Sequence, residues 1–142
     1  MKTVFYGISF ILLLASNVWT QDQNNVQVEV LAKTSSSWDG NTLPEYESGT
    51  PEVTILKVII PSNAQLPLHE HPVINAGVLL KGSLMVVTED NDTLHLKAGD
   101  TIVEVVNKWH YGINEGNEPA EIIVFYAGVQ DQPITIKEPD KE

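Results

Sequence analysis

The sequence predicts an all-β protein, and two observations lead to this prediction. From residue 52 onward, short apolar and β-branched segments recur between turns that contain glycine, asparagine and proline. Beyond the first 20 residues, no window of about twelve residues places its apolar positions at the helical period of about 3.6 residues. Short strands at this spacing indicate a single β-sandwich or β-barrel.

The expected strands follow one another along the chain. Residues 26–31, VQVEVL, alternate apolar and polar positions as a strand does, and residues 33–51 form a loop rich in Ser, Gly and Pro. Further strands are expected at residues 53–60, 65–71, 74–80, 83–87, 94–100, 101–106, 109–114, 121–129 and 133–136. The 142 residues are enough for one domain with short extensions. We expect a strand and loop segment at 21–51, a barrel at 52–136 and a charged tail at 137–142.

The first 20 residues have the layout of a secretory signal peptide. Lys2 precedes an apolar run from Val4 to Ala15, which is shorter than the about 20 residues that span a bilayer. Cleavage is expected after Ser16 or Thr20, and the alternatives are an uncleaved anchor or a buried strand. The layout predicts a secreted or periplasmic protein with no membrane attachment after the signal is removed.

Charge and composition exclude several classes of function. The formal net charge is −11, from 19 acidic and 8 basic residues, and such a surface repels nucleic acid and anionic lipid. The chain has no cysteine, so it forms no disulfide, no thiolate nucleophile and no cysteine-ligated zinc site. A metal site would therefore use histidine, carboxylate, amide or water ligands.

The spacing of the histidines points to a metal site. His69 and His71 are two residues apart, so a strand places them on one face. Inside a barrel, two unpaired imidazoles are costly, but they offer two nitrogen ligands to one metal ion. On the surface the same pair would be harmless. His110 follows a turn forty residues later, whereas His95 lies between Leu94 and Leu96 and is expected in solvent.

Two motifs make the chain resemble a small, single-domain protein of the cupin superfamily. The first family motif is G-x5-H-x-H-x3,4-E-x6-G, and NAQLPLHEHPVINAGVLLKG matches both histidines and the last glycine. The second is G-x5-P-x-G-x2-H-x3-N, which GDTIVEVVNKWHYGIN matches at its first glycine, its histidine and its final asparagine, Asn114. Asn63 and Asn107 replace turn glycines, and asparagine tolerates positive φ better than other residues do. Val105 replaces the proline.

The resemblance implies a cupin barrel, a double-stranded β-helix or jelly roll, with an extended N-terminal loop segment. It also implies one divalent metal ion, Fe, Mn, Ni or Zn, held by His69, His71 and His110. Asn75 stands where the family motif has its glutamate ligand. The amide of Asn75 would either bind the metal through its oxygen or hydrogen-bond a group around it.

Three aromatic residues are candidates for a ligand pocket. Trp38 and Tyr46 would either cover a ligand at the barrel mouth or pin the loop to the outside of the barrel. Tyr126, near the end of EIIVFYAG, could enter the cavity as a proton donor.

The expected function is that of an exported, metal-binding protein with a small-molecule ligand. One hypothesis is a metal-dependent isomerase, hydrolase or dioxygenase acting on a small oxygen-rich molecule, either sugar-derived or carboxylated. The other is a module that binds metal and ligand without turnover. Titratable groups in the cavity besides the histidines would favour the enzyme. Exposed strand edges favour a homodimer.

Overall fold

The computed structural model of the chain describes residues 25–139, so the expected signal peptide lies outside the described part. No described residue belongs to a helix long and apolar enough to cross a membrane. Within residues 25–139 the secondary structure is β throughout, with strands β1 (Pro51–Ile60), β2 (His69–Glu70), β3 (Ile74–Lys81), β4 (Ser83–Thr88), β5 (Thr93–Lys97), β6 (Thr101–Val103), β7 (His110–Ile113), β8 (Ala120–Val129) and β9 (Ile136–Lys137).

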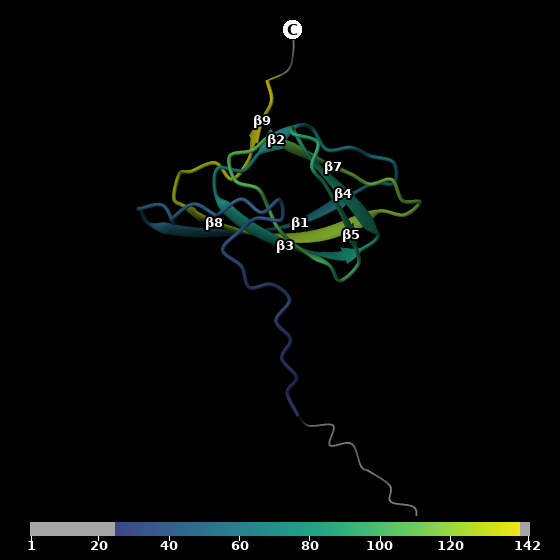
Figure 1. Cartoon of the computed structure of the whole chain (residues 1–142), viewed down its shortest axis with the longest axis horizontal. Coiled ribbons are helices and arrows are strands. Elements are labelled where there is room, and N and C mark those ends of the chain that lie inside the picture. Colours follow the sequence, from purple (N-terminus) through teal and green to yellow (C-terminus); the bar gives the residue numbers. More distant parts are fainter. Residues whose placement is uncertain (1–24, 140–142) are drawn as a thin grey trace, which may run out of the picture.

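Two antiparallel sheets face each other across the core. One sheet has the strand order β1-β8-β3-β6, and the other has the order β5-β4-β7-β2-β9. Figure 1 shows β1, β3 and β8 on one side of a common interior and β2, β4 and β7 on the other. The predicted all-β class and barrel-like double-sheet architecture are confirmed.

Alternation along the strands builds the core. In β8, the even-numbered residues Ala120, Ile122, Val124 and Tyr126 are buried, because successive side chains of a strand point to opposite faces. They pack with buried side chains of the other strands, which include Leu79, Leu84, Ile102, Leu96 and Ile60.

Two asparagines occupy the turns that the motif comparison assigned to them. Asn63 has φ 58° and Asn107 has φ 53°, both in the left-handed region. The turn at Asn107 also touches the histidine segment, because its backbone N–H donates to the carbonyl of His71 at 2.9 Å. The prediction that asparagine replaces glycine here for conformational reasons is confirmed.

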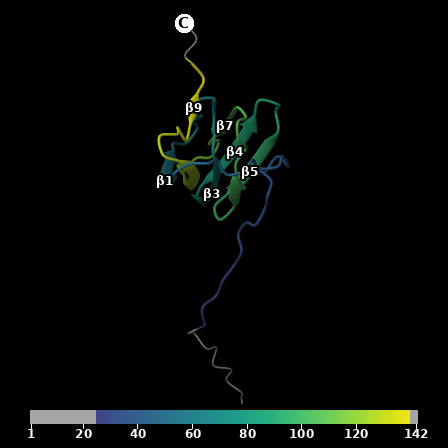
Figure 2. The ribbon, with the colours of Figure 1, turned by 90° about the vertical axis from the view of Figure 1, so that its left-hand side faces the viewer.

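Residues 26–31, predicted as a strand, form none. Val26, Val28 and Val30 are 90%, 87% and 71% exposed, and the segment leads away from the barrel (Figure 2). The prediction was wrong because alternation describes a side-chain pattern, whereas a strand also needs a neighbour to accept its backbone hydrogen bonds. The strands expected at 65–71 and 133–136 are present only as β2 and β9, with two residues each.

The loop that follows this segment is fixed to the barrel. The backbone N–H of Trp38 donates to the carbonyl of Val103 at 2.9 Å, and the Trp38 side chain packs against the core. Asp39, whose carboxylate is almost fully buried, pairs with Lys108 at 3.1 Å. These contacts place the loop beside β6 and the turn that precedes β7.

The outer face of the first sheet is apolar and exposed. Val53, Ile55 and Ile59 of β1 are 67%, 58% and 57% exposed, and Phe125 of β8 is 47% exposed. In the described part of the chain β1 is also an edge strand, paired only with β8.

Asn114 ties the loop between β7 and β8 to the end of β1, and its replacement should destabilise the fold. Its buried amide donates to the carbonyls of Ile60, Pro61 and Glu118 and accepts from the N–H of Gly116. We expect Asn114→Ala to lower the free energy of unfolding by about 3 kcal/mol, because these buried groups lose their partner. Urea denaturation measures the change, and the exposed Asn117→Ala is the control. An equal, small effect of both variants would contradict this role for Asn114.

Candidate metal centre

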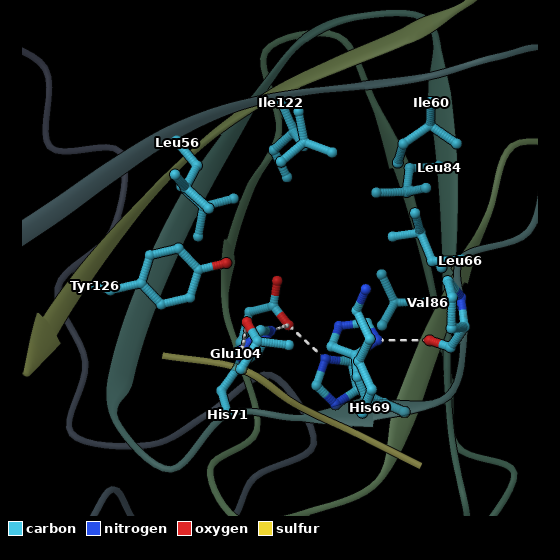
Figure 3. Close-up of a pocket in the computed structure, with 17 residues that line it drawn as sticks. Leu56, Ile60, Leu66, His69, His71, Leu84, Val86, Glu104, Ile122 and Tyr126 are labelled. Atoms are coloured by element: carbon cyan, nitrogen blue, oxygen red, sulfur yellow. Dashed lines mark hydrogen bonds and ion pairs between the residues drawn. The ribbon is translucent and has the colours of Figure 1, made fainter. Parts of the chain in front are cut away.

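Three histidines from two neighbouring strands converge at one end of the barrel interior. His69 in β2 and His110 in β7 are direct cross-strand partners, and His71 lies just beyond β2. Their ring centroids are 4.5 to 5.1 Å apart, and one ligand atom from each ring lies within 4.8 Å of the others. Such a group could hold one metal ion, and Figure 3 shows His69 and His71 facing the cavity.

The same backbone interaction orients each ring. The Nδ1 atoms of His69, His71 and His110 lie 2.7, 2.7 and 2.9 Å from the carbonyl oxygens of Pro67, Ile134 and Lys108. A carbonyl can only accept a hydrogen bond, so Nδ1 carries the proton in all three rings. The neutral ring then presents a lone pair at Nε2, which is the form that binds a metal ion.

Burial keeps two of these rings neutral. Burial lowers the pKa of His69 to about 4, although the hydrogen bond that its ring donates to the carbonyl of Pro67 opposes this effect. Burial also lowers the pKa of His71, although the charge of Glu104 opposes this effect. His110 is buried too, but the carboxylate of Glu104 outweighs the burial and raises its pKa.

Glu104 is a site residue that the sequence analysis did not single out. It follows β6, in the sheet opposite the histidines, and its Oε2 lies 2.9 Å from His110 Nε2 and 3.8 Å from His71 Nε2. Burial alone would raise the pKa of Glu104, but the histidines hold it below its usual value, so the group is a carboxylate. Alternation in TIVEVV places Glu104 on the same face as the buried Ile102. This pattern could have identified Glu104 as an inward-facing residue from the sequence.

The centre opens into a cavity of about 310 Å³. Figure 3 shows apolar side chains, among them Leu56, Ile60, Leu84 and Ile122, at the end of the cavity away from the histidines. The hydroxyl of Tyr126 points into this space. Burial and the nearby charge of Glu104 raise its pKa to about 12, so Tyr126 keeps its proton at neutral pH.

The remaining candidates occupy different places. Asn75 is fully buried in β3; its Nδ2 donates to the carbonyl of Val73 at 3.4 Å, and its Oδ1 has no partner within the described residues. Tyr126 lines the cavity. Asn75, Trp38 and Tyr46 are not among the described residues that line it. Tyr46 is 79% exposed. His95 is exposed in β5, as expected.

The fold and the site together define a β-barrel protein with a three-histidine group at one end of its cavity. The Cupin domain family matches residues 56–126, which is half of the chain, and the chain belongs to this family. A search of curated proteins finds no match.

Solved structures share the fold. An oxalate oxidase in complex with the substrate analogue glycolate is 24% identical, covers 60% of this chain and 45% of its own, and has a TM-score of 0.52. The DMSP lyase DddQ from Ruegeria pomeroyi DSS-3 is 20% identical and has a TM-score of 0.55. The match covers 63% of this chain and 45% of the lyase. A Bacillus subtilis oxalate decarboxylase studied for its Mn(II) centres is 21% identical and has a TM-score of 0.52. The match covers 64% of this chain and 29% of the decarboxylase. The matched region thus spans less than half of each of these proteins.

Replacement of one of the clustered histidines should weaken metal binding. We expect the wild-type protein to bind one equivalent of Co²⁺ or Zn²⁺, and His71→Gln or His110→Gln to lose at least about tenfold in affinity, because one of three nitrogen ligands is removed. Titration against a chelator of known affinity measures the constants.

The matched control is His95→Gln, which removes an exposed histidine in β5. This variant should bind metal like the wild type. Equal losses in all three variants would show that metal binds to histidines in general and not to this cluster.

Proposed function

We propose that the protein is a metal-dependent enzyme that acts on a small carboxylated molecule with an apolar body. The observation that carries the proposal is the convergence of three Nε2 atoms on a cavity that also contains Glu104 and Tyr126. A module that only captures a ligand needs no further titratable groups beside its metal ligands. Tyr126, which is not needed as a metal ligand, therefore supports an enzyme over the alternative, a metal- and ligand-binding module without turnover.

The residues have separate roles in this proposal. His69, His71 and His110 hold the metal ion, which would act as a Lewis acid or, if it is iron, in oxygen chemistry. Tyr126 donates a hydrogen bond from its protonated hydroxyl to a substrate oxygen. The surrounding apolar side chains exclude water, which strengthens these polar interactions. Isomerase, hydrolase and dioxygenase chemistry are each compatible with this arrangement, and the metal decides among them.

The lining of the cavity supports a carboxylated substrate more than a sugar-derived one. The space of about 310 Å³ suits a small molecule, and most of its wall is aliphatic, so it offers few partners to a row of hydroxyl groups. Lys137 at the cavity adds one positive charge that a carboxylate can approach. The glycolate complex of the oxalate oxidase and the Mn(II) centres of the oxalate decarboxylase lend support from proteins with the same fold.

Export and dimerisation belong to the same proposal. The layout of the first 20 residues supports a secreted or periplasmic protein. The exposed apolar face of β1 and β8, which includes Ile55 and Phe125, supports a homodimer formed through this sheet. The acidic charge of the chain argues against nucleic acid as a partner.

Metal identification with product analysis tests whether the protein is an enzyme. Protein purified from its native compartment is analysed for metals, and is incubated with a panel of small carboxylic acids beside His71→Ala. We expect a bound metal and conversion of at least one acid, followed by NMR and oxygen consumption, and loss of both in the variant. Iron favours an oxygenase, whereas zinc or nickel favours isomerase or hydrolase chemistry. A metal-loaded protein that binds acids and converts none would support the binding module.

A carboxylate series tests the substrate class. Acetate, butyrate and hexanoate should bind the metal-loaded protein about fourfold more tightly per added methylene, since each buried methylene contributes about 0.8 kcal/mol. Calorimetry measures the affinities, with xylose as the polyol control. In Tyr126→Phe the acids should bind about tenfold more weakly at unchanged metal content, because one hydrogen bond is lost. Equal affinities along the series would contradict an apolar subsite.

A further inference from the structure

Asn75 of β3 and Glu104, which lies just beyond the end of β6, are neighbours, and Glu104 is the one that carries a carboxylate. Asn75 stands at the motif position of the acidic ligand, and Glu104 lies just beyond the end of the adjacent strand. The backbone N–H of Glu104 donates to the carbonyl of Asn75 at 3.1 Å, so the two residues are direct neighbours. Position 75 therefore lacks a carboxylate, but the neighbouring Glu104 supplies one that lines the cavity.

The carboxylate of Glu104 has no permanent positive charge beside it. Its side chain is 11% exposed, and among the described residues its ion pairs are with His71 and His110 alone. Both rings donate Nδ1–H to backbone carbonyls, so each ring turns its Nε2 atom toward the carboxylate. Oε2 of Glu104 and Nε2 of a ring approach this closely only with a proton or a metal ion between them, and a buried charge is stable only when it is paired or bound to a metal ion.

The spacing between Glu104 and the two rings fits a bound metal ion. His110 Nε2 is buried and lies 2.9 Å from Oε2 of Glu104. Two donors about 2.1 Å from one metal ion lie about 3 Å apart at a right angle and about 4 Å apart on opposite sides. The separations of 2.9 and 3.8 Å from Oε2 to His110 and His71 fall in this range.

We propose that Glu104 supplies the charged oxygen ligand of the metal centre, in place of the residue at position 75. This inference rests on the proposed metal centre and extends it by a fourth protein ligand, from the opposite sheet. Asn75 then fills the space beside Glu104 without binding the metal. The ligand set becomes three neutral imidazoles and one carboxylate, which leaves a divalent ion with one net positive charge in an apolar cavity.

The test compares Co²⁺ affinity and the Co²⁺ absorption spectrum in wild-type protein, Glu104→Gln and Glu104→Asp. Glu104→Gln removes the charge at nearly the same shape, and Glu104→Asp keeps the charge but withdraws the oxygen by one methylene. We expect both variants to bind Co²⁺ at least about tenfold more weakly and to show a changed visible spectrum, since a ligand is lost or displaced. In a zinc-loaded crystal structure, the Glu104 oxygen should lie about 2.1 Å from the metal.

Glu70→Gln is the matched control, because Glu70 lies between His69 and His71 but is not among the described residues that line the cavity. It removes one charge near the site and should change the affinity by less than about threefold. Equal losses in Glu70→Gln and Glu104→Gln would reduce the effect to long-range charge and overturn the proposal. A weaker affinity with an unchanged spectrum would overturn it as well, since Glu104 would then act through a hydrogen bond. If wild-type protein binds no Co²⁺, the three-histidine centre itself is disproved.

Discussion

Three hydrogen bonds from histidine Nδ1 atoms to backbone carbonyls hold the functional end of this barrel together. Each donation to the carbonyl of Pro67, Ile134 or Lys108 determines which ring nitrogen carries the proton and which way the ring faces. Without them, the rings would rotate and share their protons with water or with one another. The backbone that surrounds the histidines is thus as much a part of the centre as the rings themselves.

The barrel places these polar side chains at one end of a cavity whose other end is apolar. Histidines from one sheet meet Glu104 and Tyr126 from the other, while Leu84, Ile122 and their neighbours line the opposite end. In such surroundings a charge is poorly solvated, so attraction between Glu104 and a bound cation is stronger than in water. The same surroundings favour a ligand with one polar end and one apolar end.

Much of the fold follows from patterns that are local in the chain. The buried face of β8 follows the period of a strand, and the left-handed turns at Asn63 and Asn107 follow from the tolerance of asparagine for positive φ. The same alternation misleads at residues 26–31, where no strand lies alongside. A strand forms only when a second segment pairs with its backbone, and the pattern of one segment does not show whether such a partner lies beside it.

The sequence by itself determined the all-β class, the pairing of His69 with His71 on one face, and the family resemblance that brought in His110. These features depend on spacing along the chain, which the period of a strand translates directly into direction. Only the tertiary structure decided that Glu104 joins the histidines and that Trp38 and Tyr46 lie outside the cavity lining. The reason is that contacts across two facing sheets depend on how the sheets pack and on the register of their strands. The spacing of residues along the chain does not indicate which of them meet across the two sheets.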